Sequence, residues 1–131
     1  MTFFPLFHNT NTLKALLIGG GTIATRRAKS LIKAGVACDV IATSVSEELT
    51  YLIESSSGGV TIDAYATDEV MIGYGLILAL TDDRAVNKQV ASDAKSMGLL
   101  VNVADSPNDG NVIFGATIDR APLTIAINNG G

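Results

Sequence analysis

A glycine-rich segment near the start of the chain has the spacing of a dinucleotide-binding loop. Residues 19–24 read Gly-Gly-Gly-Thr-Ile-Ala and fit the pattern G-x-G-x-x-A. Gly19 would allow a tight turn, Gly21 would let the backbone approach a pyrophosphate, and Ala24 would let a helix pack closely on a strand. The pyrophosphate would lie at the positive end of that helix. The alternative is a glycine-rich strand-to-helix turn that binds no ligand.

The end of the second predicted strand indicates which dinucleotide this loop would bind. In such folds an acidic residue about 20 positions after the glycines binds the ribose 2′-hydroxyl of NAD, whereas an arginine accommodates the 2′-phosphate of NADP. Thr43 and Ser44 stand at this position, and Asp39 lies too early in the strand to take part. We therefore expect the two hydroxyls to contact the ribose, and NAD to be preferred over NADP.

Two further strand ends would bring polar residues to the same place. Thr81 and Asp82 follow the apolar run 76–80, and Asp105 follows the run 99–103. Ligands of open parallel sheets bind outside the carboxyl ends of the strands. We therefore place Asp105 beside the nucleotide crevice and take Thr81 and Asp82 as candidate cofactor contacts. The alternatives are that the run Thr81-Asp82-Asp83 caps a helix and that Asp105 starts a turn.

Short apolar runs alternate with helical patterns along most of the chain. Apolar spacing predicts the helices, Ser46 is a candidate N-cap, and Gly35 is a candidate for the position after a helix end. The run 76–80 is wholly apolar, as expected for a central parallel strand covered on both faces. The predicted strands are 13–18, 38–42, 60–63, 76–80 and 99–103, and the predicted helices are 22–34, one from Ser46, and 82–97 with a stripe of Ala85, Val86, Val90 and Ala94.

The end of the chain follows a different pattern. Two strand-like runs, 112–118 and 122–127, have no helix between them, so we expect them to pair antiparallel at one edge of the sheet. The predicted fold class is therefore α/β and Rossmann-like. It has a mainly parallel sheet, helices on both faces and a C-terminal antiparallel strand pair.

Composition limits the classes of protein that the chain could be. Its 131 residues suggest one domain over 1–131, and 47% hydrophobic against 17% charged residues excludes intrinsic disorder. One Cys and one His exclude a Cys/His zinc site within one chain, and we expect no metal. The net charge of −4 argues against binding nucleic acid, and the longest apolar run is too short to cross a membrane. We expect a cytoplasmic domain.

Several motifs in order along the chain resemble the precorrin-2 dehydrogenase module, which occurs alone or as the N-terminal part of siroheme synthases. The similarity covers essentially all 131 residues. Asp-Arg-x-Pro-Leu at 119–123 and Asn-Val-x-Asp at 102–105 are more specific than the glycine loop. The matching segments are 4–7, the glycine loop through Lys29, 79–83 with Val86 and Asn87, 101–105, and 118–127.

The resemblance implies an activity and assigns residues to it. It implies NAD-dependent oxidation of precorrin-2 to sirohydrochlorin, with insertion of ferrous iron as an additional activity of many members. The aspartate of Asn-Val-x-Asp, which the resemblance implies is catalytic, is Asp105. The family's nucleotide contacts correspond to Thr22 and Ile23, and to Thr43 and Ser44. The family forms homodimers with the help of helices that follow a Gly-Gly pair, and we expect those helices to lie outside residues 1–131.

A substrate rich in carboxylates needs a local positive charge on this acidic chain. Arg120 could offer a bidentate guanidinium to a substrate carboxylate, the alternative being an ion pair with Asp119. Arg26 and Arg27 lie on the first predicted helix, where we expect one to approach the cofactor and the other to be solvated. Two other functions compete: a module that binds NAD without turnover, and a regulatory nucleotide domain of a potassium-transport type. The latter does not explain Asp-Arg-x-Pro-Leu.

Overall fold

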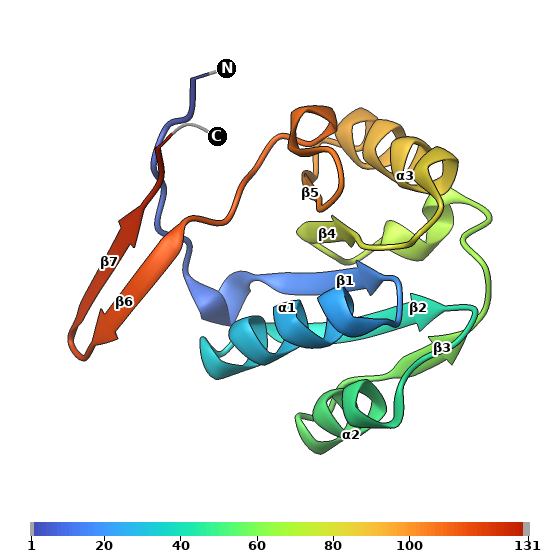
Figure 1. Ribbon diagram of the computed structural model, residues 1–131, viewed down its shortest axis with the longest axis horizontal. Helices are drawn as coiled ribbons and strands as arrows, with labels where there is room; N and C mark the ends of the chain where they lie inside the picture. Colours follow the sequence, from blue (N-terminus) through green and yellow to red (C-terminus); the bar gives the residue numbers. More distant parts are fainter. Residues whose placement is uncertain (1, 130–131) are drawn as a thin grey trace.

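The computed structural model describes residues 2–129, so the glycines at 130 and 131 lie outside the described residues. Five strands form one sheet in the order β3-β2-β1-β4-β5, and every neighbouring pair is parallel. All five carboxyl ends therefore lie along the same edge of the sheet (Figure 1). The strands are β1 Lys14–Ile18, β2 Ala37–Ala42, β3 Val60–Ile62, β4 Leu76–Ala79 and β5 Leu100–Val103.

Helices cover both faces of this sheet, which gives it two apolar cores. Side chains alternate along each strand, so Leu17 and Leu78 lie in one core and Ile18 and Ile77 in the other. The first core holds buried residues of α1 (Thr22–Lys33) and α2 (Glu47–Ser55), and the second holds those of α3 (Arg84–Ser96). Three short 3₁₀ helices complete the unit: η1 Thr10–Thr12, η2 Asp68–Met71 and η3 Pro107–Asp109.

Local signals in the sequence set the ends of these helices. Ser46 caps α2 by accepting a hydrogen bond from the Leu49 N–H at 3.2 Å, and Gly35 has a φ of +92° just after α1. The helix α3 begins at Arg84, two residues later than predicted. The reason is that Asp83 is its N-cap: the Asp83 carboxylate accepts hydrogen bonds from the N–H groups of Ala85 and Val86. Its predicted stripe is wrong at Ala85, which is exposed, whereas Asn87 and Ala91 are buried.

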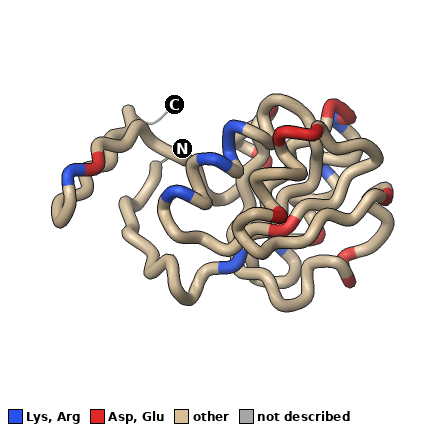
Figure 2. Tube along the Cα trace, turned by 90° about the horizontal axis from the view of Figure 1, so that it is seen from below, with Lys and Arg blue, Asp and Glu red and all other residues tan. Residues whose placement is uncertain are grey.

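The predicted fold class is confirmed, but the expected place of the antiparallel pair is wrong. β6 (Ala116–Arg120) and β7 (Leu123–Ile127) pair with each other as a separate two-stranded sheet. The free side of β5 is covered by Asn111, whose side chain accepts from the Val101 N–H at 2.8 Å and donates to the Leu99 carbonyl at 3.0 Å. With those backbone groups satisfied, the hairpin lies apart from the main sheet (Figures 1 and 2).

The β6–β7 hairpin has one apolar and one polar face, and all ten strand residues are exposed. The register puts Ile118 opposite Ile125 and Arg120 opposite Leu123, so these side chains share a face with Ile127. The other face carries Thr117, Asp119, Thr124 and Ala126. None of the helices within residues 2–129 is both long and apolar enough to cross a bilayer.

Candidate functional site

The loop between β1 and α1 needs its first two glycines for packing and leaves space at the third. Gly19 has a φ of +137°, and a Cβ there would lie 2.6 Å from the Leu80 backbone. A Cβ at Gly20 would lie 2.1 Å from the Ser44 carbonyl oxygen. A Cβ at Gly21 would meet nothing within 4 Å. The pattern G-x-G leaves the middle position open, so it gave no sign that Gly20 is required.

The start of α1 presents backbone donors to the space at Gly21. The first hydrogen bond of α1 runs from the Thr25 N–H to the Gly21 carbonyl, at 3.0 Å. The N–H groups of Thr22 and Ile23 precede it and therefore have no partner within the helix. Both side chains are exposed, whereas Ala24 is fully buried against the sheet. Free N–H groups at the positive end of a helix can hold the phosphates of a dinucleotide.

The end of β2 borders the glycine loop directly. Thr43 and Ser44 are exposed there, and the Ser46 N–H donates to the Gly20 carbonyl at 3.2 Å. The acid earlier in the strand, Asp39, is fully engaged elsewhere, since it accepts from the Tyr74 hydroxyl at 2.5 Å and pairs with Lys14 at 3.4 Å.

The electrostatics of Asp39 match a structural role. Burial by itself would raise the pKa of Asp39. Hydrogen bonds from Tyr74 and the Gly59 N–H, together with the charge of Lys14, outweigh burial and lower that pKa. The carboxylate therefore stays ionised for its bonds within the protein, away from the carboxyl end of β2.

Beyond β4, the polar residues divide between the helix start and the open edge. The Thr81 hydroxyl donates to Asn87 Oδ1 at 2.6 Å, and Asn87 Nδ2 donates to the Thr81 carbonyl at 3.0 Å. Thr81 therefore helps to hold the start of α3, whereas the residue that caps this helix is Asp83. Asp82 is exposed and makes no hydrogen bond or ion pair with the described residues.

Asp105 follows β5 at the same edge of the sheet. It is exposed, and its carboxylate makes no hydrogen bond or ion pair within residues 2–129. The next turn, η3, begins after Ser106 without a side-chain cap, so Asp105 does not act as its capping group. The parallel register places this free carboxylate at the edge where the glycine loop also opens.

Arg120 lies away from this edge. It ends β6 in the hairpin, which extends on the side of the sheet opposite the carboxyl ends of the strands (Figure 1). Its Nη1 donates to the Asp119 carbonyl at 3.0 Å. The alternative of an ion pair with the Asp119 carboxylate is wrong, because neighbouring residues of a strand point to opposite faces. The structure does not bring Arg120 to the site within one chain.

The two arginines of α1 have different surroundings. Arg26 lines a cavity beside Gly21. We expected the other arginine to be solvated, and for Arg27 this is wrong. Its guanidinium carbon lies 4.9 Å from the centre of the Phe114 ring, and its Nε is buried without a partner. Burial, and to a lesser degree the charge of Arg26, lower the pKa of Arg27. Arg27 therefore ties the segment before the hairpin to α1.

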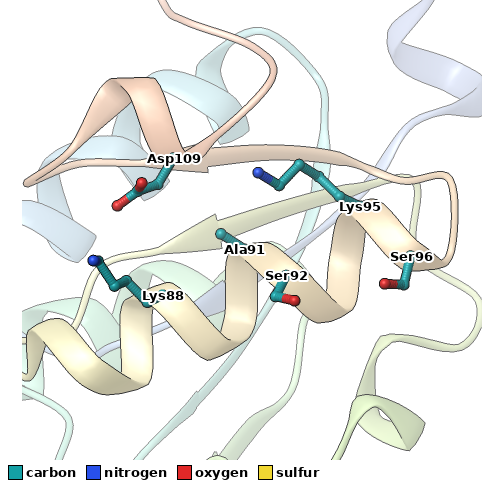
Figure 3. A pocket seen from close by; sticks show the side chains of 6 residues that line it. All are labelled: Lys88, Ala91, Ser92, Lys95, Ser96 and Asp109. Carbon is teal, nitrogen blue, oxygen red and sulfur yellow. The ribbon is translucent and has the colours of Figure 1, made fainter.

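In the part of the chain that the structure describes, cavities lie on both faces of the sheet. One, of about 420 Å³, opens between the starts of α1 and α2; its lining is Gly21, Thr22, Thr25, Arg26, Lys29, Ser46 and Glu48. The other, of about 370 Å³, is a groove between α3 and η3; its lining is Lys88, Ala91, Ser92, Lys95, Ser96 and Asp109 (Figure 3). Only the first adjoins the glycine loop.

Comparisons with known proteins agree with this geometry. A family model described as "Putative NAD(P)-binding" matches residues 6–116. Siroheme synthases of Pseudomonas fluorescens (strain SBW25) and Stutzerimonas stutzeri (strain A1501) are 42% and 40% identical over all 131 residues. The chain spans 28% of the length of these relatives.

A solved structure, "SirC, precorrin-2 dehydrogenase", superposes with a TM-score of 0.80 at 33% identity, covering 97% of this chain and 62% of that one. This match agrees with the α/β, Rossmann-like fold class that we predicted for the chain from its sequence. The motif resemblance noted in the sequence is confirmed by these matches, and the family match supports NAD as the cofactor.

Proposed function

The chain belongs to this NAD(P)-binding family, and on that premise we propose that it oxidises precorrin-2 to sirohydrochlorin with NAD, in siroheme biosynthesis in the cytoplasm. The names of its relatives, siroheme synthase and precorrin-2 dehydrogenase, support the substrate. The observation that carries the proposal is the free Asp105 carboxylate at the edge where the glycine loop opens.

The residues of the loop fit the cofactor. The empty space at Gly21 would admit the pyrophosphate, and the N–H groups of Thr22 and Ile23 would bind it. Gly19 and Ala24 shape the turn and its packing, while the hydroxyls of Thr43 and Ser44 would contact the ribose. Thr81 and Asp82 complete the rim of the crevice beyond β4.

For this reaction the protein must position the macrocycle against NAD and must provide a base that accepts a proton. NAD, when bound, accepts the hydride that leaves the reduced macrocycle. Asp105 takes the proton released as the macrocycle gains conjugation, and passes it to solvent, to which it is exposed. A carboxylate that is exposed and makes no hydrogen bond or ion pair with the described residues is suited to that role.

We also propose that residues 1–131 act as one NAD-binding domain and that two copies associate through the hairpin. Its apolar face exposes Ile118, Leu123, Ile125 and Ile127 at 40–59% of their surface. Contiguous exposed apolar side chains of this kind mark association sites. Arg120 lies on the same face, so its role with a substrate carboxylate would depend on the partner copy, where it could face the partner's crevice.

The test is an assay of residues 1–131, and of the protein at its natural length, with NAD and precorrin-2. Formation of NADH together with the absorbance of sirohydrochlorin is the expected result. NAD binding without turnover at either length would instead favour a module that senses or sequesters NAD. Absence of NAD binding would contradict the proposal.

A further inference from the structure

The cavity between the starts of α1 and α2 lies where the adenosine ribose of a bound dinucleotide would be expected. Gly21 and Thr22 line it on one side and Ser46 on the other. The Ser46 N–H also donates to the Gly20 carbonyl, so the cavity lies directly between the phosphate-binding loop and the segment after β2. That segment is where folds of this type recognise the 2′ position of the ribose.

Most groups around this cavity would suit a phosphate. Arg26 and Lys29 contribute two cations from successive turns of α1. Thr22, Thr25 and Ser46 add hydroxyls, and the N-cap residues of both helices, Gly21 and Ser46, lie in the lining. By these groups alone, the cavity would favour the 2′-phosphate of NADP, contrary to the preference inferred from Thr43 and Ser44.

One carboxylate changes this balance. Glu48, in the first turn of α2, lines the cavity and forms an ion pair with Lys29 at 2.6 Å. The pair neutralises one of the two cations and puts a negative charge beside the space. Glu47 stands next to Glu48 in the same helical turn but does not line the cavity.

We propose that Glu48 is the residue that selects NAD over NADP. It supplies, from α2, the acidic group that the end of β2 lacks: its charge repels a 2′-phosphate, and its oxygen can accept a hydrogen bond from a 2′-hydroxyl. This inference rests on the proposed binding of NAD at the glycine loop. Without the Glu48 carboxylate, the remaining groups of the cavity would favour binding of a 2′-phosphate.

The test compares Glu48→Gln with the matched control Glu47→Gln by calorimetric titration of NAD and NADP at low salt. The glutamine keeps a hydrogen-bond acceptor and loses the charge, so NADP affinity should rise about tenfold while NAD affinity stays within about twofold. Glu47→Gln should change neither. The gain for NADP should shrink in high salt, because the Lys29 and Glu48 side chains are 56% and 60% exposed.

A second variant guards against an indirect effect of Glu48→Gln on α2. Lys29→Gln removes a cation and leaves Glu48 unpaired, so NADP should bind more weakly than to the wild type. The inference is overturned if Glu48→Gln leaves NADP affinity unchanged, or if both glutamate variants raise it equally. Absence of NAD binding to the wild type would be a different result, because it contradicts the proposed function first and this inference with it.

Discussion

Strands β4 and β7 have similar sequences and opposite surroundings. β4 reads Leu-Ile-Leu-Ala and is buried at every position, whereas β7 reads Leu-Thr-Ile-Ala-Ile and is exposed at every position. β4 has a strand on each side and helices on both faces, while within residues 2–129 β7 pairs with β6 alone. Apolar, β-branched composition thus favours a strand in both places, and only the neighbours decide whether it is covered.

The two regions also differ in what they contribute. The five-stranded unit brings the glycine loop, the end of β2 and Asp105 to one edge without help from the hairpin. The hairpin holds one candidate site residue, Arg120, far from that edge. If this division is right, substitutions at the sheet edge change chemistry and cofactor binding, and substitutions on the hairpin change association.

The largest contrast should come from Asp105→Asn. Losing a general base typically lowers turnover about 100-fold to 10,000-fold. The melting temperature and NAD affinity should stay the same, because the carboxylate has no partner within the described chain. Steady-state assays with precorrin-2 and thermal denaturation measure the two effects, with Asp109→Asn as a nearby control. Near-normal turnover would remove Asp105 from the mechanism.

A second contrast lies within the glycine loop itself. Gly20→Ala should destabilise the fold by about 1–3 kcal/mol, because its Cβ would collide with the Ser44 backbone. Gly21→Ala, where nothing lies within 4 Å, should be nearly neutral. Chemical denaturation of the two variants compares them directly. Equal stability would mean that the β2–α2 segment yields more readily than the geometry indicates.

Gly21 should instead matter for the cofactor. Gly21→Leu should weaken NAD binding at least about tenfold, equal to about 1.4 kcal/mol, because the side chain would occupy the space in which we propose that the pyrophosphate binds. Its φ of −96° suits any L-residue, so folding should be unaffected. Calorimetric titration is the measurement, and unchanged affinity in a folded variant would place the cofactor elsewhere.

The smallest effect on stability should come from the hairpin. Ile125→Lys should change the free energy of unfolding of the monomer by no more than about 0.5 kcal/mol, as for other exposed positions. It should nevertheless shift a dimer toward monomer, since it puts a charge on the apolar face. Thr124→Lys adds the same charge to the polar face and should leave association intact. Sedimentation at several concentrations tests both, and a monomeric wild type would contradict the proposed role of the hairpin.

The sequence by itself determined most of the elements and the place of most candidate site residues in the fold. The glycine loop, the Ser46 cap, the turn at Gly35 and the apolar strands follow from rules that act within a few residues, so they could be predicted. The carboxyl-edge position of Asp105 and Thr43 followed from the parallel arrangement, which the strand–helix alternation indicates.

Tertiary structure alone decided the contacts between distant segments. It made Gly20 indispensable through Ser44, committed Thr81 to Asn87, covered β5 with Asn111 and so separated the hairpin and Arg120 from the site. It also brought Glu48 into the cavity that Gly21 lines, although the two residues are 27 positions apart in the chain. Sequence patterns register spacing along the chain, whereas each of these contacts depends on how two elements pack in space.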